Sequence, residues 1–399
     1  MRNSAFRRLW LTSGASAVAL SAYLLFEQWY VVRELGEPSA LGAVMAATVA
    51  SRLLLMSVGG VLVDRFRAAR VAAWSATSRL ALVLVMVGFL QAGWLTVTTV
   101  LVFGVLYGAC DAFFSPAVTS LAPRLVPGQQ LRAANAALHS TNQGGMIAGP
   151  LLGAAVLALS FTAALVAVAA LLVVAAASVA WLQEPQHTRR APGTRLLDEA
   201  LTGLRHLRTV RGAWQNLLII VAVNLVFMGP LLMGIPLLVA ADPAATPADL
   251  GVLQGAYAAG MIAGAGVAAL AGDRLWLVRA LLPFLGACLV GVGLLPHLWQ
   301  VGLMAAMGIA SSVINVLIIT HIQRATDPEI IGRVMAFVTI ASSGTLPVSY
   351  AVLGALVGAG LPVAAVIVGA GALVLLLGAG FAVGAGLAGR RTPSPATTR

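Results

Sequence analysis

The chain has 399 residues, of which 60% are hydrophobic and 9% charged, and its mean hydropathy is +0.96. Soluble domains carry about 25% charged residues, so this composition excludes a soluble enzyme and indicates an integral membrane protein. The net charge is +11, but all 24 basic residues are arginines whose positions mark loops rather than a nucleic-acid-binding surface. Because Cys110 and Cys288 lie in apolar stretches, neither a disulfide framework nor a thiolate metal site is expected.

Stretches free of Asp, Glu and Arg define the expected membrane spans, since a transmembrane helix needs about 20 mostly apolar residues. Three such stretches are long enough for two helices each, and their turns are expected near Ser160, Pro296 and Pro362. With the single spans they give twelve helices. In chain order, the predicted spans are 9–32, 41–63, 71–90, 95–121, two within 133–183, 217–240, 250–272, two within 280–323 and two within 334–389.

The arginines test this count, because positively charged loops concentrate on the cytoplasmic side of a membrane. Of the 24 arginines, 21 fall in the termini or in every second loop. Arg33 falls on the opposite side, and Arg52 and Arg79 fall within spans. We therefore expect a multi-pass protein of the cell membrane with both termini in the cytoplasm.

A long polar segment divides the chain into two sets of six spans. The predicted units are an N-terminal bundle at 1–182, a cytoplasmic linker at 183–212, a C-terminal bundle at 213–389 and a cytoplasmic tail at 390–399. The linker places leucines at helical spacing from residue 197 to 207, which is typical of an amphipathic helix on a membrane surface.

The two halves also share short repeats at equivalent places. Asp64, Arg65 and Arg70 recur at an offset of 209 as Asp273, Arg274 and Arg279, and Pro127, Arg132 and Gly153 recur at an offset of 201 as Pro328, Arg333 and Gly354. Parallel duplication of this kind is typical of transporters whose halves move around a central site.

Three motifs carry a resemblance to the major facilitator superfamily. The loop from Gly60 to Arg70 resembles the superfamily signature between helices two and three, and the segment with Gly145, Gly149, Pro150 and Gly153 resembles its antiporter motif in helix five. Residues 111–117, 123–127 and 131–136 are similar to the enterobactin-exporter-like branch of drug efflux proteins. The resemblance implies an all-α membrane protein with twelve helices in two pseudo-symmetric six-helix bundles.

The same resemblance implies a gate made of charged loops. Asp64 would lock against the start of the eleventh helix at 327–329, and Asp273 would make the equivalent contact with the fifth. The alternative is that these charges only fix the topology. The chain departs from the family where Gly104 replaces an arginine linked to proton coupling. The implied gating residues are Gly60, Asp64, Arg65, Arg70, Arg124, Asp273 and Arg274.

Glycines at a spacing of four or five residues form strips on two predicted helices. Gly145, Gly149 and Gly153 lie on one face of the fifth helix, and Gly251, Gly255, Gly260 and Gly264 give the eighth helix a comparable strip. We expect close packing across the two halves, with ordinary helix-to-helix contact as the alternative.

Ionisable groups at membrane depth are costly and therefore mark functional candidates. Glu27 shares a predicted helix face with Tyr23 and Tyr30. By resemblance, the helices of Glu27 and Asp111 line the central cavity, so these carboxyls are candidates for binding protons or cationic substrates. Asp111 and Arg79 also share a depth, so they could instead neutralise each other. Asn142, Asn224 and Asn315 are further polar candidates, either as ligands or as helix-to-helix hydrogen bonds.

These features predict a secondary active transporter that exports an amphipathic small molecule, such as a drug, antibiotic or siderophore, by alternating access and proton antiport. The antiporter-like fifth helix favours export, and the alternatives are a proton-coupled uptake symporter or a membrane-embedded enzyme. The acids and histidines form no catalytic or metal cluster in the sequence, so no metal or other cofactor is expected beyond a proton gradient. The expected partners are a small molecule and the lipid bilayer, without nucleic acid, and the expected state is a monomer.

Overall fold

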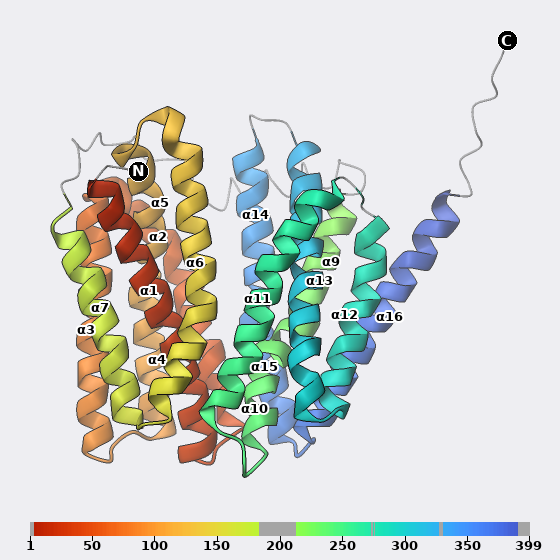
Figure 1. The fold of residues 1–399 in the computed structure, drawn as a ribbon, viewed down its shortest axis with the longest axis horizontal. Helices are drawn as coiled ribbons and strands as arrows, with labels where there is room; N and C mark the ends of the chain where they lie inside the picture. Colours follow the sequence, from red (N-terminus) through yellow and green to blue (C-terminus); the bar gives the residue numbers. More distant parts are fainter. Residues whose placement is uncertain (1–3, 183–212, 273, 275, 327–329, 390–399) are drawn as a thin grey trace.

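The computed structural model of the protein describes residues 4–182, 213–272, 274, 276–326 and 330–389, and nearly all of them are helical (Figure 1). The helix α1 begins, and α16 ends, at the same end of the molecule, which is the upper end in Figure 1. We refer to this end as the upper end and to the opposite one as the lower end. The predicted linker helix and tail, and the 327–329 run, lie outside the described residues.

The first half of the chain forms a bundle of long helices. Its first span ends in a short π-helical turn, and its fourth span is divided into two helices near Ala112. The Thr96 side chain caps the start of α4, and Ser160 caps α7. The elements are α1 (Ser4–Trp29), η1 (Tyr30–Glu34), α2 (Ala40–Arg65), α3 (Ala68–Gln91), α4 (Val97–Asp111), α5 (Phe114–Leu125), α6 (Gly128–Leu157) and α7 (Phe161–Ala180).

The second half follows a similar plan, but its fifth span is broken instead of its fourth. Its first span carries a π-helical turn that begins at Pro230, and Gly344 separates α14 from α15. The expected turns near Ser160, Pro296 and Pro362 are confirmed, because each lies between two consecutive helices. The elements are α9 (Ala213–Gly229), η2 (Pro230–Gly234), α10 (Ile235–Ala240), α11 (Pro247–Ala271), α12 (Trp276–Leu294), α13 (His297–Arg324), α14 (Ile331–Ser343), α15 (Thr345–Gly358) and α16 (Val363–Gly389).

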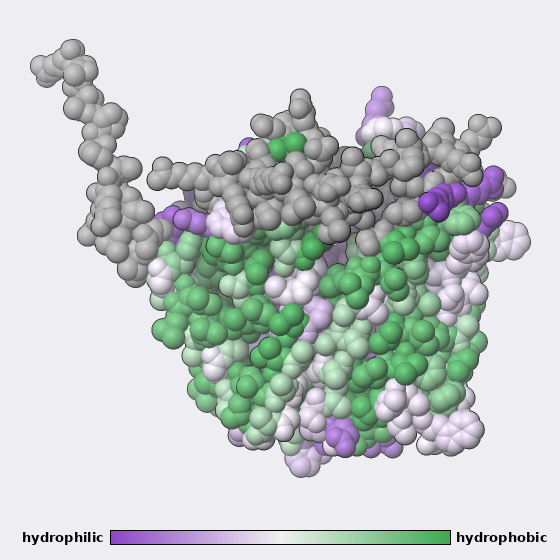
Figure 2. Space-filling model, turned by 180° about the vertical axis from the view of Figure 1, so that it is seen from behind, coloured by the Kyte–Doolittle hydropathy of each residue, from purple (hydrophilic) through white to green (hydrophobic). Residues whose placement is uncertain are grey.

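The surface between the two ends is apolar. Figure 2 shows a broad hydrophobic band over the visible sides, with hydrophilic residues gathered toward the upper and lower margins. Large side chains such as Leu54, Leu84 and Leu376 are exposed on the helices. Within the described residues, ten helices are long and apolar enough to cross a membrane, and Ala40–Met56 is a shorter apolar helix. The protein is therefore a multi-pass membrane protein.

The two halves meet closely near the lower end. There α2 packs against α15, and α6 packs against α11. Gly42 and Gly354 approach so closely that a Cβ on Gly42 would lie 2.7 Å from the Gly354 Cα, and a Cβ on Gly251 would lie 2.6 Å from the Ala154 Cβ. In Figure 1, α6 and α11 converge toward the lower end, whereas α6 and α14 stand apart at the upper end. The structure thus shows halves that are joined at one end.

The glycine strips confirm the expected packing across the halves for Gly251 and Gly255 and correct it for the strip on α6. Gly145 and Gly153 do not reach the other half: they pack against α1, where their added Cβ atoms would meet Ala17 and Ala22. The face of α6 that meets α11 instead carries Pro150 and Ala154. One face of α6 therefore packs against α1, and a different face packs against α11. The full assignment is Gly145, Gly149 and Gly153 to α1, Gly251 and Gly255 to α6, and Gly260 and Gly264 to α13.

Arg33 fastens the two halves at the lower end. Its Nη2 atom donates hydrogen bonds to the carbonyl oxygens of Ala245 at 2.7 Å and Asp242 at 2.9 Å, and its guanidinium lies 5.3 Å from the centre of the Trp29 ring. The one arginine that the loop count places opposite the others thus connects η1 with the loop between α10 and α11.

Replacing Arg33 with glutamine should weaken this contact and increase the separation of the halves at the lower end. A hydrogen bond from a charged donor contributes about 1.5 kcal/mol or more, so the open-to-closed ratio at this end should rise by about ten-fold. Spin labels on Glu37→Cys and Ala244→Cys would measure the change as a longer distance population. An unchanged distance distribution would show that Arg33 does not hold the halves together.

Candidate functional site

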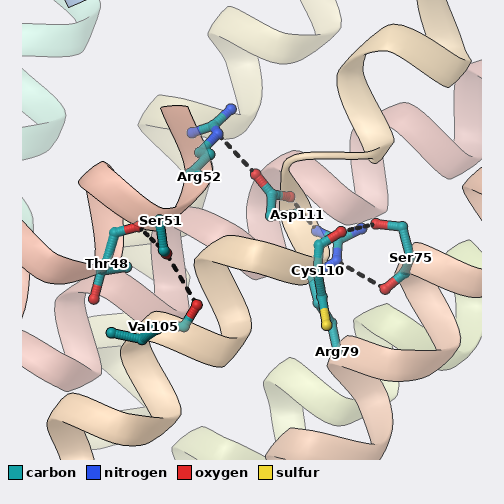
Figure 3. A network of polar contacts seen from close by, with 8 residues as sticks. All are labelled: Thr48, Ser51, Arg52, Ser75, Arg79, Val105, Cys110 and Asp111. Atoms are coloured by element: carbon teal, nitrogen blue, oxygen red, sulfur yellow. Dashed lines mark hydrogen bonds and ion pairs between the residues drawn. The ribbon is translucent and has the colours of Figure 1, made fainter. Parts of the chain in front are cut away.

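Three charged side chains form a network inside the N-terminal half (Figure 3). Asp111 lies at the end of α4, and its Oδ1 is 2.6 Å from Nη1 of Arg79 on α3. Its Oδ2 is 3.0 Å from Nε of Arg52 on α2. The pairing of Asp111 with Arg79, one of the two alternatives from the sequence, is observed, and Arg52 adds a second cation to the same carboxylate.

Arg79 is enclosed by protein on every side. Its side chain has no exposed surface, and its Nε donates a hydrogen bond to the Ser75 carbonyl oxygen at 3.2 Å. The guanidinium carbon lies 4.8 Å from the centre of the Phe114 ring and 5.9 Å from that of Tyr107. A buried cation requires a partner, so Asp111 is the counter-ion that makes this position tolerable.

Asp111 and Arg52 also line a cavity of about 440 Å³. The Arg52 side chain is 39% exposed, in contrast with Arg79. Asp111 therefore pairs with Arg79 and also faces a cavity. The two alternatives from the sequence, an ion pair and a cavity-lining role, are compatible. The other polar lining residues come from α1, α5 and α6 and are Ser13, Ser16, Ser115, Thr119, Asn135, His139 and Asn142.

Glu27 occupies a separate, fully buried position on α1. Its Oε1 lies 3.3 Å from the Thr48 hydroxyl on α2, and its Oε2 has no hydrogen-bond partner among the described residues. No described arginine forms an ion pair with this carboxyl. Tyr350 from the second half lies near enough to interact electrostatically with Glu27, so the carboxyl sits where α1, α2 and the opposite half come together.

The hydrogen-bond geometry around Thr48 favours a protonated Glu27. The Thr48 hydroxyl lies 2.9 Å from the Val44 carbonyl oxygen as well as 3.3 Å from Glu27 Oε1. A hydroxyl carries one hydrogen and cannot donate fully to both acceptors. If Glu27 is a neutral acid, its own proton can be donated to Thr48 while Thr48 donates to Val44. The site can therefore hold a proton, and losing it would leave a bare charge in an apolar setting.

Two stacked tyrosines lie between this carboxyl and the arginine network. The rings of Tyr23 and Tyr107 are 4.0 Å apart and nearly parallel. Buried polar atoms normally have hydrogen-bond partners. In this region, however, four buried polar atoms have no partner among the described residues: Tyr23 Oη, Glu27 Oε2, Arg79 Nη2 and Tyr107 Oη. Their concentration here marks the region as a functional candidate rather than ordinary core.

Gly104 provides the space for the Glu27 carboxyl. A Cβ at this position would lie 2.6 Å from Glu27 Oε1 and would also overlap the Thr48 hydroxyl. Gly104→Ala should therefore lower the free energy of unfolding by about 1–3 kcal/mol, as expected for an overpacked interior. Thermal or denaturant unfolding of the purified protein would measure it.

Gly88→Ala is the matched control, because a Cβ there meets no atom within 4 Å. Alanine is the better helix former, so this control should be neutral or slightly stabilising. Equal stability of the two variants would contradict the packing role of Gly104.

The structure does not bring every predicted site residue together. The Tyr30 ring stacks on Phe26 at 5.4 Å and meets Phe161 edge to face, and its hydroxyl donates a hydrogen bond to the Leu95 carbonyl oxygen at 3.4 Å, so none of these contacts is with the Glu27 carboxyl. Tyr30 is the first residue of the π-helical turn η1, where wider turns change the helical phase. Asn224 donates a hydrogen bond to the Ser342 carbonyl oxygen at 3.2 Å, which supports the helix-to-helix alternative. Asn315 is exposed on α13, whereas Asn142 lines the cavity.

The predicted gating residues are only partly described. Gly60 and Asp64 lie in the last turns of α2, but the surroundings of Gly60 and the side chain of Asp64 are outside the described part of the structure, as is all of Asp273. Arg65 is exposed at the end of α2, and Arg70 is exposed in the first turn of α3. Arg274 is exposed between α11 and α12, and Arg124 lies half-buried in the last turn of α5. The lock between Asp64 and the eleventh span remains a prediction.

Sequence reasoning missed Thr48 and Tyr107, which surround the two carboxyls. Both are uncharged and lie in apolar stretches. Their positions near the carboxyls depend on the direction in which each face of α2 and α4 points, which the sequence does not give. Arg52 was singled out as a charge in a span, but its pairing with Asp111 was not predicted. His139 was not predicted as a lining residue either, although it lies three residues before Asn142 on the same helix.

Comparison with known proteins settles the family. The family model described as Major Facilitator Superfamily matches residues 9–346. The chain belongs to the major facilitator superfamily. It is accordingly a secondary transporter, acting on a small molecule across a lipid bilayer, rather than an enzyme. No curated protein matches the sequence.

Solved transporters of this superfamily share the fold at low sequence identity. The nucleoside transporter NupG is 14% identical, with a TM-score of 0.74 over 96% of this chain and 99% of that one. A bacterial homologue of the human lysosomal transporter Spinster, inward-facing and unoccupied, is 14% identical, with a TM-score of 0.72 and 98% of each chain covered. An auto-inhibited peptide transporter of the POT family is 15% identical, with a TM-score of 0.67 and 98% of each covered. At these identities the likeness concerns the fold.

Proposed function

We propose that this superfamily member is a proton-coupled exporter of an amphipathic small molecule, such as a drug, antibiotic or siderophore, of the enterobactin-exporter-like branch. The observation that carries the proposal is the pair of sites in the N-terminal half. One is a buried carboxyl, Glu27, which can hold a proton. The other is a polar cavity with an apolar part, formed by residues such as Leu20, Phe114 and Val118. An antiporter has to bind both of its cargoes, and these two sites would provide for a proton and a small molecule.

The proposal includes a topology. The described helices fit twelve crossings if α4 with α5, α9 with η2 and α10, and α14 with α15 each form one span. The bundles would comprise residues 1–182 and 213–389, joined by a cytoplasmic linker at 183–212 and followed by a tail at 390–399. With both termini in the cytoplasm, the joined lower end faces outward, and the cavity belongs to an inward-facing state of a monomer in the cell membrane.

Alternating access would then work by exchanging contacts at the two ends. Separation of the halves at the lower end requires release of the Arg33 contacts and of the close glycine contacts. The gating residues at the upper end, above all Asp64 and Asp273, would form their contacts in the opposite state. Such paired contacts bias a two-state equilibrium without fixing either state.

Transport direction and coupling can be tested together. A susceptibility and metabolite-export panel, comparing cells that lack the protein with cells that overproduce it, selects a substrate by its altered retention. Inside-out vesicles with an acidic lumen should then accumulate that substrate and lose accumulation when a protonophore collapses the gradient. Uptake driven in the opposite orientation would instead identify a symporter and overturn the export proposal.

A further inference from the structure

The charges around the cavity do not cancel. Asp111 contributes one negative charge, and Arg79 and Arg52 contribute two positive ones. Since Arg79 is enclosed and already has Asp111 as its counter-ion, Arg52 supplies a surplus positive charge on the cavity side. From this surplus we infer that the cavity binds the anionic group of an organic substrate, a carboxylate, sulfonate or phosphate. The inference rests on the transporter proposal and names the class of its substrate.

The orientation of Arg52 supports this assignment. Its contact with Asp111 uses Nε, and Figure 3 shows the two terminal nitrogens directed away from Asp111. A guanidinium presents its donors in a planar fork that matches an oxyanion with two hydrogen bonds. Arg52 can therefore contact an anion through its terminal nitrogens, or move from Asp111 to the anion while Arg79 keeps Asp111 neutralised.

The remaining lining favours the same class of ligand. Asp111 is the only acid among the described residues that line the cavity, and both of its oxygens are occupied by arginines. Amide and imidazole groups line the same cavity as Arg52 and can donate hydrogen bonds, namely those of Asn142 and His139. The neighbouring carboxyl Glu27 is not part of the lining. The earlier interpretation of Asp111 as an acceptor for cationic substrates is therefore disfavoured.

The energetics point the same way. A net charge at membrane depth is costly unless it is paired or hydrated. An entering anion compensates Arg52 and gains two charge-assisted hydrogen bonds, whereas an entering cation meets like charge. The discrimination is thus set by the cavity itself and does not depend on the rest of the substrate, which the apolar lining can hold by contact.

Charged thiol reagents can measure this potential directly. The two free cysteines, Cys110 and Cys288, are first replaced by alanine, and Asn142→Cys is introduced as a reporter in the cavity. The reporter is treated with an anionic reagent, 2-sulfonatoethyl methanethiosulfonate, and with its cationic trimethylammonium counterpart, each rate being normalised to a free thiol. The anionic reagent should react on the order of five-fold faster than the cationic one, as one nearby unit charge requires.

Variants of the arginine separate the proposal from a general surface effect. Arg52→Gln should bring the normalised ratio to about one, and Arg52→Lys should preserve it. Arg279→Gln, which changes an arginine lining a different cavity in the second half, should leave the ratio unchanged. Thermal unfolding checks that each variant is folded, and Thr119→Cys provides a second reporter. A ratio of one or below in the parent protein, or one insensitive to Arg52, overturns the anion site.

The labelling result is independent of transport. Because the reagents report the sign of the potential without substrate movement, a failed vesicle assay would count against the transporter proposal alone. A cationic preference at the reporter would overturn the anion inference alone, even if vesicles transport the substrate selected by the panel. The two failures are therefore distinguishable.

Discussion

Replacing Asp111 with alanine should be the most destabilising single change in the described structure, lowering the free energy of unfolding by about 3–5 kcal/mol. The substitution leaves the guanidinium of Arg79 fully buried with its charge uncompensated. It also frees Arg52, but that side chain is 39% exposed and loses less. Unfolding of the purified protein by denaturant or heat in detergent would measure the difference.

A double-variant cycle distinguishes loss of the ion pair from loss of packing. Arg79→Met in the Asp111→Ala background removes the unpaired charge and should recover a large part of the stability, because a buried pair can be replaced by apolar groups at little cost. Glu37→Ala serves as a control for loss of an exposed carboxyl. If the double variant were no more stable than Asp111→Ala, the buried charge would not be the cause.

The outline of this fold could be predicted from the sequence because charge-free length is a strong signal. A bilayer excludes unpaired polar backbone and most charges, so helices and turns follow from where charges occur. The turns at Ser160, Pro296 and Pro362 coincide with helix ends for this reason. The polar first half of α6 weakens that signal, and this helix is not among the ten apolar spans.

The contacts between helices could not be predicted in the same way. Successive residues turn by about 100° around a helix axis, so a sequence strip defines a face but not which neighbour that face meets. The strip with Gly149 was expected across the halves but packs on α1. The packing of Tyr30 on Phe26 and Phe161 likewise follows from neighbours that no residue pattern indicates. The pairing of Arg79 with Asp111 could be considered from the sequence because the two residues have the same expected depth in the membrane.

The candidate site contains some residues that could be predicted from the sequence and others that could not. Glu27 was recognisable from its charge alone, since few carboxyls lie at such depth. Its partners Thr48 and Gly104 were not, because their importance depends on the close approach of α1, α2 and α4. Gly104, which the resemblance marked as a missing arginine, proves to be the residue whose lack of a side chain admits the carboxyl. The absence of an arginine at position 104 and the presence of the Glu27 carboxyl are therefore linked, because a side chain at position 104 would overlap this carboxyl.

Glu27→Gln should uncouple transport from the pH gradient while leaving the protein folded. Glutamine has the shape of the neutral acid and can donate to the Thr48 hydroxyl as the protonated carboxyl would, so stability should hardly change. It cannot release a proton. At zero membrane potential, a gradient of one pH unit can sustain about a ten-fold accumulation for one proton exchanged per substrate, and the variant should show none.

Vesicles that contain the selected substrate on both sides provide the decisive comparison. Exchange of labelled for unlabelled substrate needs no proton and should continue in Glu27→Gln, whereas gradient-driven accumulation should disappear. Glu37→Gln removes an exposed carboxyl at the lower end and should leave both activities intact. Persistent ten-fold accumulation in Glu27→Gln would transfer the coupling role to another group. Loss of exchange as well would instead place Glu27 in the movement of the halves, through its hydrogen bond with Thr48 of α2, the helix that packs against α15.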